Sequence, residues 1–233
     1  FLTPRALASA ASGVYKRPIQ GDLPKGWQDV LNNHKKAISA EAPGWATRKA
    51  SGEALAVLTG LIPEMIGGSA DLTGSVNTKT PDTEPVSAGN FKGRYIHYGV
   101  REHAMAAAMN GMALHGGIIP YSGTFLVFTD YCRPSIRLAA LMGLRVIYVM
   151  PHDSIGLGED GPTHQPVEHL MSLRAMPNLL VMRPADAVET AECWALALGQ
   201  KTRPSLIALT RQIVRPVRTE AVTANLSAHG AYV

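Results

Sequence analysis

The sequence has little of what marks several special classes of protein. Its 233 residues include two cysteines, Cys132 and Cys193, and neither has a second cysteine or a histidine at metal-ligand spacing. Disulfide-built and zinc-finger folds are therefore excluded, and both thiols are expected to be free and buried. The sequence also lacks a secretory signal and any apolar run of the roughly 18 residues that a membrane span requires. We therefore expect a cytoplasmic protein without a membrane partner.

Charge is sparse as well. Charged residues make up 17% of the chain, the formal net charge is +4, and lysines and arginines are scattered along the sequence. No nucleic-acid partner is expected, because no basic run is interleaved with aromatics. The hydrophobic share of 46% is enough for a buried core. The first residue is Phe1 rather than Met, so we expect a piece of a longer protein.

Segments typical of strands alternate with segments typical of helices from about residue 46 onward. Strands are expected at 65–67, 95–98, 118–121, 145–150, 179–182 and 205–210. Helices are expected at 30–41, 49–61, 102–114, within 124–142, near 167–174 and at 186–198, and a polar loop at 71–93. This alternation predicts an α/β fold: a three-layer, doubly wound, mainly parallel sheet with helices on both faces. Ligands of such sheets bind beyond the carboxyl ends of the strands.

One loop beyond such a strand, residues 153–166, reads DSIGLGEDGPTHQP and contains G-x-G-x-x-G. A dinucleotide fingerprint is disfavoured, because five residues separate the strand from Gly156 and prolines flank His164. A metal site is disfavoured, because the histidines and acids lack paired ligand spacing. A purely structural, turn-rich loop stays open as an alternative. The interpretation we favour is a polar substrate-binding loop.

Five motifs together resemble the transketolase family. HDSIGLGEDGPTHQP at 152–166 is similar to that family's signature loop. The others are GGSADL at 67–72, GRYIHYGVREHAM at 93–105, TFLVFTDY at 124–131 and LTRQ at 209–212. The resemblance implies the pyrimidine-binding domain, the middle domain of three.

The resemblance also implies a division of the chain. Residues 1–45 are an approach segment, of which 1–20 match no recognised motif. Residues 46–215 are the pyrimidine-binding α/β domain, and residues 216–233 begin a connection to a third domain. The diphosphate-binding domain, with the ligands of the Mg²⁺ ion, is expected in a preceding part, and no metal ligand is predicted in this chain.

The implied reaction moves a two-carbon ketol unit from a ketose phosphate to an aldose phosphate with thiamine diphosphate, as in the pentose phosphate pathway. The implied partner is a second copy of the chain, with the active site between the two subunits, so this piece alone is expected to be inactive. Two alternatives remain. One is dihydroxyacetone synthase or another thiamine enzyme of similar layout, and the other is a free-standing, non-catalytic subunit that pairs with a separate diphosphate-binding chain.

The resemblance assigns roles near the cofactor. Glu102 aligns with the catalytic glutamate, which hydrogen-bonds a ring nitrogen of the aminopyrimidine. By itself, Glu102 is an acid in the first turn of a helix. Phe125, Phe128 and Tyr131 recur every three residues and would share one helical face, where core packing is the ordinary explanation. The resemblance makes them the wall of the pyrimidine pocket, with Phe128 the first choice for stacking.

The resemblance assigns the substrate phosphate to four residues: Arg48, Ser75, His152 and Arg211. In isolation these would be surface charges, a turn residue and a loop histidine. Asp160 and His164 match residues that hydrogen-bond the substrate's hydroxyls. Three further histidines, His97, His103 and His115, are expected to be structural, with His103 a possible neighbour of Glu102.

Overall fold

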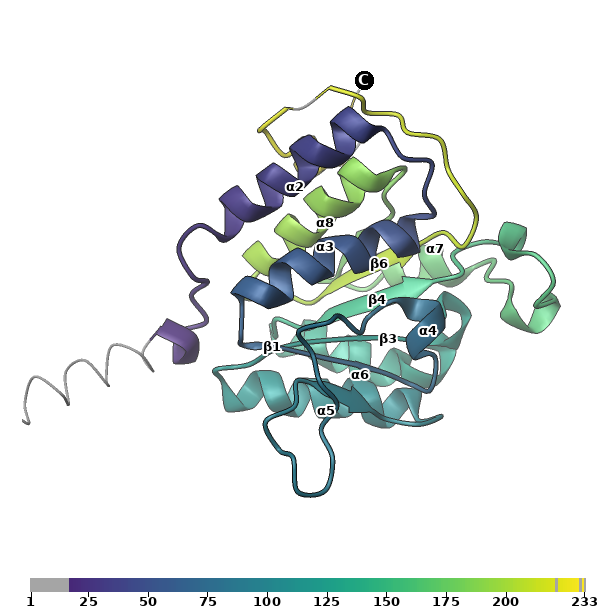
Figure 1. Cartoon of the computed structure of the whole chain (residues 1–233). Coiled ribbons are helices and arrows are strands. Elements are labelled where there is room, and N and C mark those ends of the chain that lie inside the picture. The colour runs from purple at the N-terminus through teal and green to yellow at the C-terminus, as the bar shows by residue number, and fades with distance from the viewer. Residues whose placement is uncertain (1–16, 221, 231, 233) are drawn as a thin grey trace, which may run out of the picture.

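The sheet at the centre of the molecule is entirely parallel. The computed structural model describes residues 17–220, 222–230 and 232 (Figure 1). Its six strands lie in the order β2-β1-β3-β4-β6-β5. They are β1 (Met65–Ser69), β2 (Tyr95–His97), β3 (Ile119–Gly123), β4 (Ile147–Pro151), β5 (Leu180–Met182) and β6 (Ser205–Leu209). Every pair of neighbours runs in the same direction, which confirms the predicted α/β fold.

Helices cover both faces of this sheet (Figure 1). On one face lie α3 (Thr47–Leu61) and α8 (Ala187–Gly199), with α2 (Trp27–Glu41) outside them. On the other lie α5 (Glu102–His115), α6 (Thr129–Leu141) and α7 (His169–Arg174). Strand β4 shows why two covers form: Ile147 and Val149 pack into one buried cluster, while Tyr148 and Met150 pack into the other. Successive side chains of a strand point to opposite faces, so a continuous apolar strand needs helices on both.

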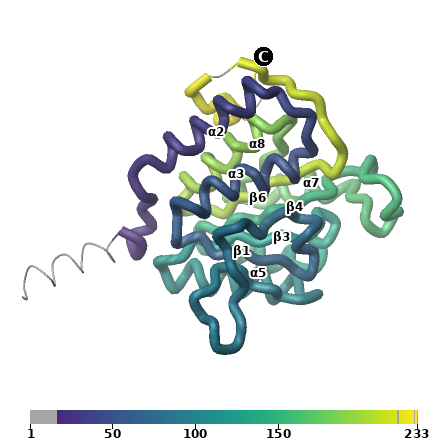
Figure 2. Tube along the Cα trace, in the orientation of Figure 1, coloured from purple at the N-terminus to yellow at the C-terminus, as the bar shows by residue number. Residues whose placement is uncertain are grey.

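The segment before residue 46 packs more closely than a linker. Helix α2 buries Leu31 and Ile38 in the same cluster as α3 and α8. The tube view shows α2 beside α8 along the outer layer (Figure 2). Residues 1–16 lie outside the described part of the chain.

One expected element differs from the structure. The polar loop after β1 contains a short helix, α4 (Thr73–Val76), which four residues are too few to signal by periodicity. The helix expected within 124–142 is α6, and a 3₁₀ turn at Leu126–Phe128 precedes it. The other elements agree with their expected ranges within three residues at each end. Cys132 and Cys193 are buried free thiols, as expected. Within the described residues, no helix is long and apolar enough to cross a membrane.

The segment after β6 returns over α8 and is held there by a buried carboxylate. Glu192 of α8 is 2% exposed, and its side chain accepts hydrogen bonds from Lys35 Nζ at 3.0 Å and from both the backbone N–H and the hydroxyl of Ser227. Arg218 Nη1 lies 2.7 Å from the same carboxylate. Burial alone would raise the pKa of Glu192, but these donors lower it below its ordinary value. One ionised carboxylate therefore joins α2, α8 and the last described segment.

Removing this carboxylate should destabilise the fold. Glu192→Ala leaves the charges of Lys35 and Arg218 buried without their partner, and we expect the free energy of unfolding in urea to fall by about 3–5 kcal/mol. Because the folded-state pKa of Glu192 is depressed, its contribution is present above the unfolded pKa of about 4.3 and is lost as the pH falls through the folded pKa. Glu41→Ala, at an exposed end of α2, is the control. A change of under 1 kcal/mol for Glu192→Ala would contradict this role.

Candidate active site

The predicted site residues gather at the carboxyl edge of the sheet, as the parallel topology requires. The loops after β1, β2, β3, β4 and β6 supply almost all of them. Arg48 comes from the first turn of α3 and joins them because its backbone N–H donates to Thr210 O, just after β6, at 3.3 Å. Two groups of side chains result: an aromatic cavity and a cluster of charged residues.

The aromatic cavity has a volume of about 520 Å³. It is lined by Ala70, Asp71, Leu72, Val100, Glu102, Phe128, Tyr131 and His164. Glu102 is the first residue of α5 and is 8% exposed. A carboxyl group at this position faces the positive end of the helix dipole. The cavity therefore combines a buried acid with a flat aromatic surface.

Of the three aromatic residues predicted for the cofactor, two line the cavity. Phe128 and Tyr131 have ring centroids 5.8 Å apart, and Tyr131 is 64% exposed at the rim. Phe125 is not a lining residue: it is 6% exposed and stacks behind Phe128, with centroids 5.8 Å apart. The three-residue spacing does align the rings, but partly through the 3₁₀ turn, in which residues three apart eclipse. Phe125 thus differs from the expected wall and supports it from behind.

The charged cluster brings together residues that lie far apart in the sequence. Arg48 Nη1 donates to the backbone carbonyl of Ser75 at 3.1 Å. Asp160 Oδ2 lies 3.4 Å from His152 Nε2 and 3.9 Å from Arg211 Nε. Arg211 also donates to Leu157 O at 2.9 Å. All four residues predicted to bind the substrate phosphate are therefore near one another, with Asp160 among them.

His152 is a neutral imidazole in this cluster. It is 2% exposed, stacks on Phe125 with centroids 3.7 Å apart, and has φ of 61°, a left-handed conformation that is uncommon for a residue other than glycine. Burial lowers its pKa to about 4, and the charge of Arg48 adds to this, while Asp160 acts in the opposite direction. His152 therefore offers a directional hydrogen bond, and the positive charge of the cluster comes from Arg48 and Arg211.

His164 connects the two groups. Its ring packs edge-on against Phe128, with centroids 5.3 Å apart at 72°, and against Phe125 at 5.9 Å. It also lines the cavity, and its charge when protonated lowers the pKa of His152. His164 thus links the cavity to the charged cluster.

The glycine-rich loop is not a nucleotide loop. Gly156 lies in a 3₁₀ turn (Ile155–Leu157) and Gly161 precedes another (Pro162–His164), so no long helix begins there to face a pyrophosphate. A metal site in this loop is opposed by the guanidinium groups of Arg48 and Arg211. The loop instead turns His152, Asp160 and His164 toward one site.

Sequence reasoning missed several residues here. Asp71 lines the cavity and has φ of 61°. It belongs to the motif GGSADL, but an aspartate after a strand can equally be a turn residue. Asp153 is 3% exposed and accepts from Arg183 Nε at 2.6 Å, which ties the loop after β4 to the end of β5. Burial raises the pKa of the Cys132 thiol to about 12, and the nearby carboxylate of Glu102 adds to this rise. No spacing signal predicts these long-range pairs.

Fold and site together define a parallel α/β ligand-binding domain with an aromatic, acid-bearing cavity beside a cationic pocket. The sequence model described as "Transketolase, pyrimidine binding domain" matches residues 44–217. The chain belongs to this transketolase family, as the motifs predicted.

Relatives and solved structures agree. Over 226 residues, the chain is 59% identical to a transketolase of Sinorhizobium medicae. The alignment covers 97% of the chain and 32% of that protein. A match of this extent includes most of residues 1–20, which the motifs had left unassigned. Transketolase from Leishmania mexicana superposes with a TM-score of 0.81 at 47% identity, over 91% of this chain and 31% of that one.

Two further structures bear on function. A Pichia stipitis transketolase in complex with sedoheptulose 7-phosphate has a TM-score of 0.80 at 41% identity, over 91% of this chain and 32% of that one. A split-gene transketolase, described as an inactive β4 tetramer, has a TM-score of 0.61 at 30% identity, over 75% of this chain and 54% of that one. The chain spans about a third of the length of the relatives it matches.

The neutral state of His152 can be measured directly. We expect its imidazole to titrate at about pH 4 by NMR of histidine-labelled protein, with the signal assigned through His152→Asn. The unfolded chain takes up this proton near pH 6.5, so stability should fall as the pH drops from about 6.5 toward 4, by at most about 1.4 kcal/mol per pH unit. His152→Asn should remove this slope, and His115→Asn, an exposed control, should keep it. Titration of His152 near pH 6.5 would refute the assignment.

Proposed function

We propose that this chain is the pyrimidine-binding part of a transketolase, which transfers a two-carbon ketol unit from a ketose phosphate to an aldose phosphate with thiamine diphosphate. The observation that carries this proposal is the cavity in which the Glu102 carboxyl and the Phe128 ring face the same space. The cationic cluster next to it supports a phosphorylated substrate.

The cavity fits a pyrimidine ring. Phe128 and Tyr131 provide flat surfaces on which a heterocycle can stack, and Ala70 and Leu72 provide apolar lining. When bound, thiamine diphosphate supplies the carbon acid and the electron sink for carbon–carbon bond cleavage. Glu102, nearly enclosed by protein, holds a hydrogen bond to a ring nitrogen of the pyrimidine and so controls where the proton of that ring resides.

The charged cluster holds the substrate. Arg48 and Arg211 supply the charge that a phosphate requires, and Ser75 and the neutral His152 orient it by hydrogen bonds. Asp160 lies within this anion site and His164 lines the cavity, and from these positions they contact the hydroxyl groups near the reacting carbons. A site that pairs these hydroxyls discriminates strongly against analogues that lack them.

The rest of the active site belongs to other parts of the protein. The ligands of Mg²⁺ and the groups that hold the cofactor's diphosphate lie in the preceding domain of the proposed enzyme. A second copy of the protein supplies the facing surface, and the exposed apolar residues at the cavity rim, Val100 at 74% and Tyr131 at 64%, support such a cover. On this proposal, the complete protein is a homodimer that acts on sugar phosphates in the cytoplasm.

The split-gene neighbour supports a second candidate. A transketolase can be encoded as separate chains, so this chain could pair with a distinct diphosphate-binding chain instead of being one part of a single longer chain. The mass of the native protein distinguishes these two forms. Formaldehyde against ribose phosphate as acceptor distinguishes transketolase from dihydroxyacetone synthase.

Glu102 gives the most direct test of this function. In the complete protein with thiamine diphosphate and Mg²⁺, Glu102→Ala should lower the turnover of ketose and aldose phosphates by about 100-fold or more, because acid-base assistance is lost. Glu102→Gln should be similarly impaired, since an amide cannot exchange the proton. Glu53→Ala, an exposed acid on α3, is the control. Near-normal turnover of Glu102→Ala would remove this residue from the mechanism.

The isolated chain should have little or no activity. It contains the cavity and the anion cluster but, on this proposal, not the groups that hold the diphosphate and its metal ion. Purified chain is mixed with a donor and an acceptor sugar phosphate, thiamine diphosphate and Mg²⁺, and product is measured by coupled assay. Robust turnover without another chain would overturn the proposed division of the active site.

A further inference from the structure

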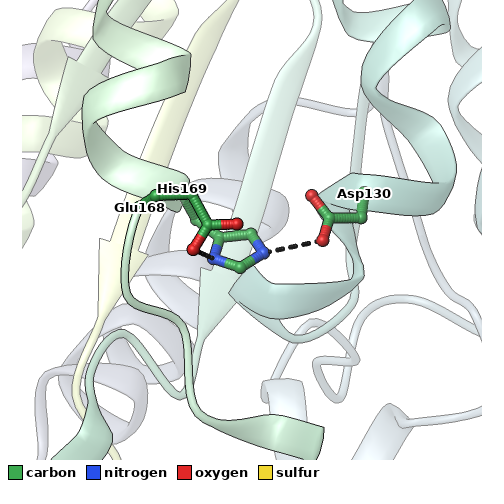
Figure 3. A group of neighbouring side chains, drawn as sticks. All are labelled: Asp130, Glu168 and His169. Carbon is green, nitrogen blue, oxygen red and sulfur yellow. Dashed lines mark hydrogen bonds and ion pairs between the residues drawn. The ribbon is translucent and has the colours of Figure 1, made fainter.

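A buried histidine that has no role in the proposed chemistry links the loop 152–168 to the segment that carries Phe128 and Tyr131. His169, the first residue of α7, is 4% exposed. Its Nε2–H donates to Asp130 Oδ2 at 2.9 Å, as Figure 3 shows. Asp130 lies in the first turn of α6, between Phe128 and Tyr131. This hydrogen bond therefore connects the start of α7 to the segment that carries the cavity's aromatic residues.

Two further residues close the connection into a ring. Arg133 Nη2 donates to Asp130 Oδ1 at 2.9 Å, and Arg133 Nη1 donates to Ser172 Oγ at 2.6 Å. The Ser172 hydroxyl in turn donates to the backbone carbonyl of His169 at 2.8 Å. Burial alone would raise the pKa of Asp130, but hydrogen bonds from Arg133 and His169 lower it, so the carboxylate is ionised. We call these four residues the clamp.

The arrangement does not suit a metal ion. Asp130, Glu168 and His169 offer three ligand atoms close together. However, Asp130 lies 2.9 Å from Nε2, while Glu168 Oε2 lies 3.9 Å from Nδ1, so the two acids face opposite nitrogens of the ring (Figure 3). The Arg133 guanidinium already neutralises Asp130. Hydrogen bonding explains this cluster better than metal ligation.

The clamp lies where it can set the position of the loop 152–168 relative to Phe128 and Tyr131. The loop that carries His152, Asp160 and His164 ends at Glu168, immediately before the clamp histidine. His164 contacts Phe128 edge-on with centroids 5.3 Å apart, and both rings line the cavity. Only four residues separate His164 from His169, so His169 anchors the loop close to His164 in the chain.

We propose that His169 is a positioning residue, which acts through Asp130 to hold His164 and the loop 152–168 against Phe128 and Tyr131. By holding His164 against Phe128, it fixes the positions of two residues that line the cavity. The effect on cofactor binding rests on the proposed function, whereas the effect on the loop does not.

The test compares His169→Leu with His169→Gln in the complete protein. Leucine removes the hydrogen bond to Asp130, while glutamine can donate an N–H in its place. The matched controls are His34→Leu and His34→Gln, on α2 on the opposite face of the sheet. Three quantities are measured: hydrogen–deuterium exchange of peptides within 153–168, the Kd of thiamine diphosphate with Mg²⁺ by calorimetry, and kcat at saturating cofactor.

For His169→Leu we expect faster hydrogen–deuterium exchange in 153–168, with exchange in α2 and α3 unchanged. The Kd of thiamine diphosphate should rise about 10-fold, while kcat at saturating cofactor should change less than about threefold. His169→Gln should restore both, and the His34 variants should match the wild type. Unchanged exchange in 153–168, a uniform rise over the whole protein, or no rescue by glutamine would overturn the proposal. If the wild-type protein binds no thiamine diphosphate, the proposed function fails, and the exchange data still decide whether the clamp exists.

Discussion

The site depends on one constraint: all six strands run in the same direction. Parallel strands end at a common edge, so the loops after β1, β2, β3, β4 and β6 meet there although they are spread over more than 140 residues of sequence. Helices on both faces leave no room for these loops except beyond that edge. Glu102 begins a helix, His152 follows a strand, and Arg48 lies in the first turn of another helix, yet the topology brings all three to the same edge.

Burial then sets the chemistry of what has been gathered. His152 stacks on Phe125 and lies near two guanidinium groups, and both effects keep its imidazole neutral. The guanidinium group of Arg211 lies close to Asp160. The positive charges of Arg48 and Arg211 oppose the binding of a metal ion in the loop. On the proposed function, the charged cluster suits an anionic substrate with hydroxyl groups, and the aromatic cavity beside it suits a flat ring.

Sequence patterns predicted most of the fold because the signals were local. The continuous apolar run at 145–150 predicted a strand covered on both faces, and Tyr148 and Val149 indeed point into different clusters. The four-residue helix α4 was missed because it is shorter than any periodic signal. The aromatic residues Phe125, Phe128 and Tyr131 were grouped correctly by spacing, but spacing could not show that Phe125 lies behind the other two.

The sequence by itself determined the family, the alternation of strands and helices, and the residue types that the site can use, since each of these is written in contiguous motifs. Only the tertiary structure decided that His152 is buried and neutral, that Glu192 joins three segments, and that Asp130 meets His169. The reason is physical. Hydrogen bonds between residues 39 or 157 positions apart, and the loss of solvent that shifts a pKa, exist only once the chain has folded.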